Sequence, residues 1–564
     1  MNATHKTHVA ARRGLSRSTL AAVALALVLA APLFFVATSF FTTDGGAWAH
    51  LRATVLPELI RSSLLLAVAV AIGVSVIGTL TAWLTAHHDF PGRAAFEWLL
   101  ILPLAMPAYV MGYAYTDALQ YAGPVQTGLR AAFGWESRAD YWFFEVQSLS
   151  GAATMLMFVL YPYVFMLARA AFLAQSASLI EAGRTFGYGG VALFFRVSLP
   201  LARPAIAAGT ALALMETLAD YGTVSYFGVS TFTTGIFNAW FSMGDRVSAA
   251  RLAVLLMTAV IVVVLIERWA RRRAQYQQSG QRHAARPRAR LHGPRAGLAV
   301  VACSVPLLVG FVIPLLLLAK LALTNLDINF AAAARFAGLA GNSFVLAAFT
   351  ALVAVALALV LAYAARAARS SLPQLVNRIV GLGYAVPGMV VAVGALIPIA
   401  ILDHALANAI QSLTGTPTGL LLTGGVGVLI YAYLVRFLSV ALQSVETGLS
   451  GITVSMDDAA RSLGSRTSSM LARVHLPLLR TSLLTAGLLV FVDVMKELPA
   501  TLVMRPFNFN TLAVEAYVLA KDERLAEAAV ASLAIVLVGL VPVILASRAM
   551  TGAMKSPQTA PPLC

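Results

Sequence analysis

Long apolar runs separated by short polar segments make up most of this chain. A transmembrane helix needs about 20 predominantly apolar residues, because each residue advances it by about 1.5 Å through a hydrocarbon layer about 30 Å thick. The pattern predicts spans at 19–41, 60–86, 97–117, 150–173, 204–225, 250–266, 297–323, 341–366, 377–401, 418–442, 480–503 and 526–547. The first run holds about 22 apolar residues, longer than the core of a secretory signal peptide, so we expect it to stay as a membrane anchor. We therefore predict an all-α, polytopic membrane protein with about 12 transmembrane helices.

The composition supports a bilayer as the solvent of this chain. Hydrophobic residues make up 59% of it, charged residues only 11%, and the mean hydropathy is +0.82. A soluble domain carries roughly 25% charged residues. The formal net charge of +16 would suit a nucleic-acid partner, but the basic residues flank apolar spans instead of forming a basic face with aromatic residues, so we expect no nucleic acid. Cys303 lies in an apolar run and Cys564 ends the chain, which indicates neither a disulfide nor a metal site.

The basic residues predict the orientation of the chain, because lysine and arginine gather on the cytoplasmic side of membrane proteins. Residues 267–296 contain nine arginines against one acid, Glu267. The first span is preceded by Lys6, Arg12, Arg13 and Arg17. Both segments are expected in the cytoplasm, and the six spans between them agree with that. We therefore expect a multi-pass protein of the cell inner (plasma) membrane with both termini cytoplasmic, and 118–149 as the longest external loop of the first half.

The chain repeats itself. Residues 181–200, EAGRTFGYGGVALFFRVSLP, and 458–477, DAARSLGSRTSSMLARVHLP, share an acid, alanine, arginine, glycine and a closing Leu-Pro, 277 positions apart and without a gap. Two further pairs align upstream, 61–70 with 341–350 and 102–112 with 382–392. Each repeat holds six spans, an even number, so both enter the membrane in the same sense. We predict two parallel six-helix halves related by an axis along the membrane normal, with a pathway between them.

The repeated polar segments are both expected in the cytoplasm, between the fourth and fifth spans of each half. In each, the acid and the alanines are expected to begin a short helix, and a glycine, Gly187 or Gly464, to bend the chain. The closing prolines, Pro200 and Pro477, suit the start of the next helix. A plain amphipathic segment would not need the same residues at the same positions twice.

These segments resemble the E-A-A---G---------I-x-L-P loop of type I ABC importer permeases, in which this loop docks on a cytoplasmic ATPase. The first copy departs from the pattern at Gly183, where the family has a second alanine, and the second copy has Asp458 for glutamate. Both have valine for the isoleucine. The resemblance assigns the ATPase-coupling role to Glu181, Ala182, Gly183, Gly187, Leu199, Pro200, Asp458, Ala459, Ala460, Gly464, Leu476 and Pro477.

The resemblance also implies a division of the chain. It covers two permease domains, 58–266 and 339–547, and leaves an additional span before each. The remaining segments are 1–57 (tail, first span and external loop), 267–296 (cytoplasmic Arg-rich linker), 297–338 (seventh span and external loop) and 548–564 (cytoplasmic tail). The fused layout and the segments 220–244 and 496–515 look like those of iron(III) permeases that work with ferric-binding proteins. Thiamine, phosphonate compounds and other small cargo remain as alternatives.

The chain contains no G-x-x-x-x-G-K-[ST] phosphate loop, so we expect it not to be an enzyme and to have no catalytic residues of its own. The resemblance implies two copies of an ATPase subunit, which bind ATP and magnesium, and a periplasmic substrate-binding protein; this chain itself is expected to bind no cofactor and has no firm metal site. A secondary transporter could also have twelve spans and repeats, but it would not need twin docking loops.

Four acids stand out because charges inside a membrane are costly and usually functional. The offset of 277 aligns Glu216 with Asp493 and Asp220 with Glu497, and we expect the second pair one turn further out on the same helix face, with Lys496 as the only base among them. They could cap broken helices or pair with Lys496. They could also line the interface between the halves as a carboxylate path, which would suit a hard cation such as iron(III).

Overall fold

The computed structural model describes residues 17–42, 47–175, 177–272, 288–324, 330–367, 371–417, 419–465 and 467–553. Most of the predicted N-terminal tail and Arg-rich linker and the end of the C-terminal tail lie outside these ranges. Within them, eleven helices are long and apolar enough to cross a membrane, or twelve if one helix pair with an 89° bend is counted as a span. This agrees with the predicted all-α fold.

The helices of the first half are α1 (Arg17–Ser39), α2 (Ala47–Thr54), α3 (Leu56–His87), α4 (Arg93–Leu99), α5 (Ala108–Leu119), α6 (Pro124–Phe133), α7 (Leu149–Leu173), α8 (Ala177–Thr185), α9 (Gly190–Leu193), α10 (Leu199–Ala219), α11 (Gly222–Tyr226), α12 (Phe232–Phe237) and α13 (Arg246–Arg272). Those of the second half are α14 (Pro294–Leu307), α15 (Ile313–Thr324), α16 (Phe330–Ala367), α17 (Leu372–Val380), α18 (Gly388–Thr414), α19 (Val426–Ser450), α20 (Val454–Ser462), α21 (Thr467–Met470), α22 (Leu476–Met495), α23 (Pro499–Met504), α24 (Leu512–Lys521) and α25 (Leu525–Ala553).

Short 3₁₀ and π-helical turns link some of these helices. The 3₁₀ turns are η1 (Leu102–Ala105), η2 (Arg138–Asp140) and η7 (Gly383–Ala385), and the π-helical turns are η3 (Phe194–Ser198), η4 (Asn238–Ser242), η6 (Leu308–Val312) and η8 (Leu471–His475). The η6 turn joins α14 and α15 into one long span.

Two predicted spans in each half are broken, at matching places. The spans predicted at 97–117 and 377–401 are interrupted before Pro107 and Pro387, each of which is the N-cap of the helix that follows. The spans predicted at 204–225 and 480–503 end early, at Ala219 and Met495, and a short helix follows in each half. In the first case the proline ring excludes the helical conformation before it. In the second, a side-chain carboxylate caps the next short helix, as described below.

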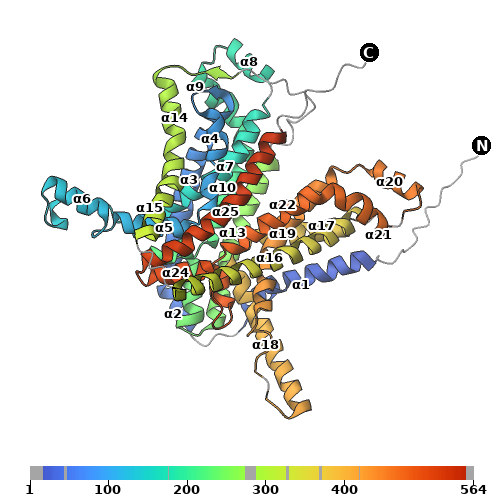
Figure 1. The fold of residues 1–564 in the computed structure, drawn as a ribbon. Helices are drawn as coiled ribbons and strands as arrows, with labels where there is room; N and C mark the ends of the chain where they lie inside the picture. Colours follow the sequence, from blue (N-terminus) through green and yellow to red (C-terminus); the bar gives the residue numbers. More distant parts are fainter. Residues whose placement is uncertain are drawn as a thin grey trace, which may run out of the picture.

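The two halves exchange their outermost helices. In the first half, α1 packs against α17 and α18 of the second half, and α13 also contacts α18. In the second half, α14 contacts α3 and α4 of the first half, α15 contacts α5, and α25 contacts α5 and η1. Figure 1 shows α25 crossing the helices of the first half. The reciprocity agrees with the predicted parallel repeat, while the extra spans belong by contact to the opposite half.

Glycine allows close helix contacts in this core. A Cβ atom at Gly78 of α3 would lie 2.6 Å from the Cβ atom of Val164, and one at Gly209 of α10 would lie 2.6 Å from its Cα atom. Small residues bring membrane helices together in this way, since van der Waals contact replaces the hydrophobic effect between them. The aligned positions of the second half, Ala358 and Ala486, are fully buried.

One small sheet departs from the all-helical pattern. Strand β1 (His88–Asp89) pairs in parallel with β2 (Ala289–Arg290), and the backbone N–H of Leu291 donates to the carbonyl of Asp89. The pairing fastens the end of the Arg-rich linker to the C-terminal end of α3. Each strand has only two residues, too few for the sequence pattern to carry a strand signal.

Candidate functional site

The two repeated polar segments fold alike. In the first, α8 ends at Thr185, Gly187 follows with a φ of +80°, and α9 and the π-helical turn η3 lead into α10. In the second, α20 ends at Ser462, Gly464 follows with a φ of +77°, and α21 and the π-helical turn η8 lead into α22. The predicted short helix, glycine bend and lead-in are therefore present in both segments. The π-helical turns were not expected.

Both bends are Schellman motifs. The N–H of Tyr188 donates to the carbonyl of Gly183 at 3.1 Å, and that of Gly187 to Arg184 at 2.9 Å. In the second segment, Ser465 donates to Ala460 at 3.0 Å and Gly464 to Arg461 at 2.9 Å. A residue with positive φ is required at this position, which explains the glycine in each copy.

The expected positions of the acids need correction. Glu181 and Asp458 do not begin their helices, because α8 starts at Ala177 and α20 at Val454. Each acid is thus the fifth helical residue, followed by Ala182 or Ala459, and lies beyond the first turn, where the helix dipole favours negative charge. An acid in the first turn is found only in the second copy, at Asp457.

The closing Leu-Pro pairs start the next helices as predicted. Leu199 and Leu476 are the first residues of α10 and α22, and Pro200 and Pro477 are the second. Proline fits there because its missing N–H would have no partner inside the helix. The backbone N–H of Leu199 donates to the carbonyl of Phe194, five residues earlier, and that of Leu476 donates to the carbonyl of Leu471. These hydrogen bonds close the two π-helical turns.

The departure at Gly183 has a packing reason. A Cβ atom there would lie 2.7 Å from Cδ1 of Leu193 and 3.3 Å from Cγ2 of Val197. The aligned residue of the second copy, Ala460, is also buried. This position therefore faces the lead-in turn, and in the first copy Leu193 leaves no room for a Cβ atom.

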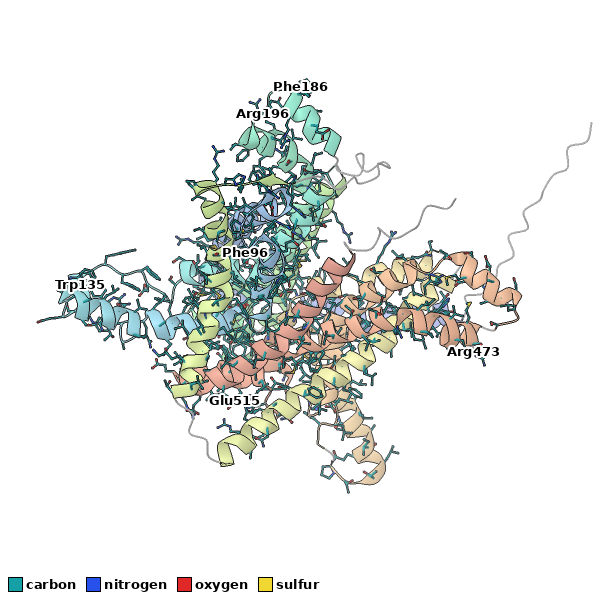
Figure 2. All side chains as sticks on the ribbon, turned by 45° about the horizontal axis from the view of Figure 1, so that its top comes forward. Phe96, Trp135, Phe186, Arg196, Arg473 and Glu515 are labelled. Carbon is teal, nitrogen blue, oxygen red and sulfur yellow. The ribbon has the colours of Figure 1, made fainter. Side chains whose placement is uncertain are left out.

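The tip of each segment exposes one large apolar side chain just before the bend. Phe186 is 78% exposed and Leu463, its equivalent at the offset of 277, is 86% exposed. Figure 2 shows Phe186 and Arg196 at one end of the molecule. Arg473, the equivalent of Arg196, lies near the end of the helices of the second half. A single exposed apolar residue is common on protein surfaces, but here one lies at the same position of both repeats.

A second candidate site is a cavity of about 130 Å³ between the halves. It brings together the four predicted acids, two from each half. Its polar and charged lining consists of Tyr109, Tyr163, Glu216, Asp220, Tyr384, Arg436, Asp493, Lys496 and Glu497. Within the described ranges, no group of three or more His, Cys, Asp or Glu side chains is placed to hold a metal ion.

Asp220 and Glu497 cap the short helices α11 and α23. Asp220 accepts hydrogen bonds from the N–H groups of Thr223 and Val224, at 3.0 and 3.1 Å. Glu497 accepts from the N–H groups of Ala500 and Thr501, both at 2.9 Å. Both acids lie beyond the ends of α10 and α22, so the prediction that they share a helix face with Glu216 and Asp493 is wrong. The capping alternative holds for these two acids, although they also line the cavity.

Two bases accompany the acids, where the sequence analysis expected one. Lys496 Nζ lies 2.9 Å from Asp493 Oδ1, so the predicted alternative of an acid paired with Lys496 holds for Asp493. Arg436 of α19 lies 3.1 Å from Glu497 Oε1, and both side chains are at least nine-tenths buried. Arg436 was not among the predicted site residues, although a single arginine within the predicted span 418–442 is a conspicuous intramembrane charge.

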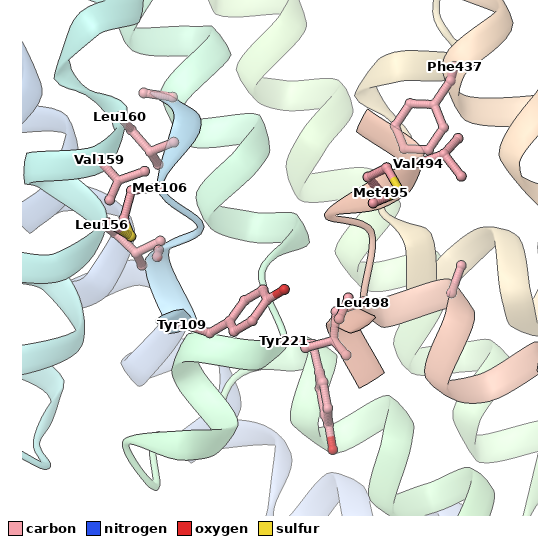
Figure 3. Packing of buried hydrophobic residues seen from close by; sticks show 14 of the residues in the cluster. Met106, Tyr109, Leu156, Val159, Leu160, Tyr221, Phe437, Val494, Met495 and Leu498 are labelled. Carbon is pink, nitrogen blue, oxygen red and sulfur yellow. The ribbon is translucent and has the colours of Figure 1, made fainter. Parts of the chain in front are cut away.

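Side chains from both halves pack together beside the cavity. The hydroxyl of Tyr517 in α24 lies 2.8 Å from that of Ser225, and it donates to Tyr221 at 3.4 Å. A Cβ atom at Gly222 would lie 2.7 Å from Leu498 Cδ2 and 3.0 Å from Tyr109 Cδ1. Figure 3 shows Tyr109 and Leu498 close together, with the ring of Tyr221 pointing away from them. Tyr221 and Leu498 are equivalent at the offset of 277, so both halves supply the same position to this packing.

Comparisons with known proteins identify related transport components. The family model described as "Binding-protein-dependent transport system inner membrane component" matches residues 74–276. The Fe(3+)-transport system permease protein FbpB 2 of Haemophilus influenzae is 26% identical over 536 residues, 94% of this chain and 97% of the relative. The molybdenum transport system permease protein ModB of Escherichia coli is 30% identical over 204 residues, 34% of this chain and 83% of the relative. A probable ABC transporter permease protein of Sinorhizobium fredii, y4fN, is 23% identical over 466 residues, 79% of each chain.

Proposed function

Because this chain belongs to the family of binding-protein-dependent transport system inner membrane components, we propose that it carries iron(III) through an ATP-driven importer. The chain is a multi-pass permease of the inner membrane and not the catalytic subunit. A transport system of this kind also has an ATPase and a substrate-binding protein. The proposal concerns the cargo, the path and the way the ATPase is engaged.

The charge of the cavity supports a cationic cargo. Four carboxylates against Lys496 and Arg436 leave a formal excess of two negative charges in a space of about 130 Å³. Relatives of this chain are named for Fe(3+) and for molybdenum transport. An oxyanion such as molybdate would be repelled by this lining, whereas a hard cation prefers carboxylate oxygens. This observation carries the choice of iron(III), together with the FbpB 2 relative that spans nearly the whole chain.

The acids of the two halves have different partners. In the second half, Asp493 and Glu497 each form an ion pair with a base. No lysine or arginine in the described part of the chain forms an ion pair with Glu216 or Asp220. We assign the first contacts with the cation to these two acids of the first half. A cation that has few ligands and lies close to positively charged side chains is bound weakly. It can therefore be released, as transport through the cavity requires.

We assign the coupling role to the two repeated segments, each docking on one of two ATPase copies. Their matched bends and the exposed Phe186 and Leu463 support this assignment. By this proposal, both segments and both termini lie in the cytoplasm, and the substrate-binding protein approaches the opposite face. Residues 58–266 and 339–547 are the two permease domains. ATP-driven closure of the ATPases would move the two segments and open the cavity outward.

Uptake measurements test the cargo. A strain lacking this chain should lose uptake of labelled iron(III), and the chain supplied from a plasmid should restore it. Labelled thiamine and labelled molybdate serve as comparisons in the same strain. Loss of thiamine or molybdate uptake with intact iron uptake would contradict the proposal and would indicate that the cavity carries that other cargo.

A further inference from the structure

A buried ion cluster lies directly behind the second coupling segment. The carboxylate of Asp457 in α20 receives Arg366 Nε at 3.0 Å and Nη2 at 3.1 Å. His475 Nε2 lies 2.9 Å from the same carboxylate, and the His475 side chain is fully buried. Burial raises the pKa of Asp457, but hydrogen bonds from Arg366 and His475 outweigh it and hold this pKa below its ordinary value. The carboxylate is therefore charged and bound from two sides.

The cluster joins four helices at one point. Arg366 belongs to the last turn of α16, and its guanidinium also donates to the carbonyls of Leu449 and Ile452, both at 2.8 Å. These carbonyls lie at the end of α19 and just after it. His475 ends the π-helical turn that leads into α22, and its ring lies 5.5 Å from that of Tyr363 in α16. A displacement of α20 would thus reach α16, α19 and α22 together.

In the first half, the positions equivalent to this cluster carry no ionisable side chain. At the offset of 277, Ile180 replaces Asp457 and Ser198 replaces His475; at the offset of 280 in the preceding span, Ala86 replaces Arg366. Among the described residues, apolar and aromatic contacts and a hydrogen bond from Gln175 hold the first segment. Phe194 packs on Trp83 and Phe172, at ring distances of 4.9 and 6.4 Å, and Gln175 Nε2 donates to the carbonyl of Ser198 at 2.8 Å.

We propose that Arg366, Asp457 and His475 are positioning residues that make the second coupling segment a stiff lever, while the first remains compliant. The two ATPase copies would then dock on mechanically unequal sites, and the second segment would transmit most of the movement to the spans. Directional, charge-assisted hydrogen bonds fix an orientation that apolar contacts leave free to slide. The inference rests on the proposed docking role of the segments and is independent of the cargo.

The experiment reads the two docking sites separately. Cys303 and Cys564 are first replaced by alanine, and a single cysteine is then introduced as Thr185→Cys or Ser462→Cys. These positions are equivalent, exposed, and last in α8 and α20. Protection of each cysteine from a maleimide reagent by the purified ATPase measures docking at that segment. The assembled complex also provides ATP hydrolysis and transport in the same preparation.

Asp457→Asn should leave protection at position 185 intact and lower it at least tenfold at position 462. The ATP hydrolysed per transported cargo should rise at least tenfold, because the second lever no longer moves the spans. Asp457→Glu should restore much of the coupling, since it returns the charge. Glu527→Gln removes a carboxylate from an exposed ion pair with Arg524 and should change neither reading.

Equal protection at both positions in Asp457→Asn, or an equal loss at both, would overturn the inequality of the two sites. A parent complex in which the ATPase protects neither position would instead overturn the docking role proposed for both segments. The two failures are therefore distinguishable.

Discussion

At the scale of single residues, the cavity contains two kinds of carboxylate. Asp220 and Glu497 cap short helices and therefore stabilise the structure even when no cargo is bound. Glu216 and Asp493 lie on α10 and α22 and cap nothing, and only Asp493 has a base as partner. Substitutions at these two kinds of acid should therefore have different effects.

Removing charge from Glu216 and Asp493 should stop transport without unfolding the permease. Glu216→Gln with Asp493→Asn keeps the side-chain sizes, and we expect at least a tenfold loss of iron(III) uptake while the ATPase still co-purifies. Glu216→Gln alone should do more harm than Asp493→Asn alone, because Asp493 is already neutralised by Lys496. Wild-type uptake in the double variant would show that the cargo crosses elsewhere or in chelated form.

Glu497→Gln should reduce stability more than Asp493→Asn. The change leaves Arg436 buried without its counter-charge, and breaking a buried ion pair costs about 3–5 kcal/mol. The side chain of Lys496 is 35% exposed and thus less buried than that of Arg436, so the loss of Asp493 should cost less. Thermal unfolding of the two variants in detergent measures the difference. Equal midpoints would contradict the structural role of the Arg436–Glu497 pair.

At the scale of helices and turns, the two repeated segments adopt the same backbone conformation. Both coupling segments end their first helix with a glycine of positive φ, and neither glycine has an atom within 4 Å of the place where a Cβ would be. A substitution at the bend therefore meets a conformational cost and no steric clash.

Gly187→Val or Gly464→Val should weaken ATPase docking, because a left-handed backbone costs an ordinary residue about 1–2 kcal/mol and a β-branched one more. Asparagine adopts this conformation readily, so Gly187→Asn and Gly464→Asn are matched controls that should keep most docking. Docking is measured by co-purification with the ATPase, and insertion by the yield of membrane protein. The double valine variant should be no milder than either single one. A bend that tolerates valine as well as asparagine would exclude the conformational explanation.

At the scale of the whole molecule, the halves hold each other by exchanged spans. A Cβ atom at Gly394 of α18 would lie 2.3 Å from the carbonyl oxygen of Pro32 and 2.7 Å from Val36 Cγ2, both in α1. On the other side, a Cβ atom at Gly310 would lie 2.6 Å from the carbonyl oxygen of Phe158 in α7. These contacts tie each additional span to the half that it does not precede.

Gly394→Leu should therefore separate α1 from α18 and destabilise the protein by about 1–3 kcal/mol or more, as overpacking does. Gly338→Leu in α16 is the control, because no atom lies within 4 Å of the place of its Cβ. The midpoint of thermal unfolding should fall for the first variant and stay near the parent for the second. A similar midpoint for both would mean that α1 does not depend on this contact.

The orientation of the chain can be tested with reporter fusions. A fusion at Gln281, in the Arg-rich segment, should report the cytoplasm, and one at Gly134, after α6, should report the outer side. An external signal at Gln281 would contradict both the twelve-span topology and the cytoplasmic position of the coupling segments.

The sequence by itself determined where the apolar runs lie, the parallel repeat and the bends of Gly187 and Gly464, but not where four of the predicted spans are broken. These depend on local properties, namely hydrophobic length and the conformational freedom of glycine, which act whatever the rest of the chain does. It also singled out the four acids, because charge in an apolar run is conspicuous.

Only the tertiary structure decided which acid has which partner and which half each additional span joins. Arg436 with Glu497, and Arg366 with Asp457, are separated by 61 and 91 residues, and no local pattern links them. The helix breaks at Asp220 and Glu497 likewise depend on capping the short helices packed beside the cavity. Such pairings arise when distant helices meet and their buried charges must find counter-charges, and this condition exists only in the folded protein.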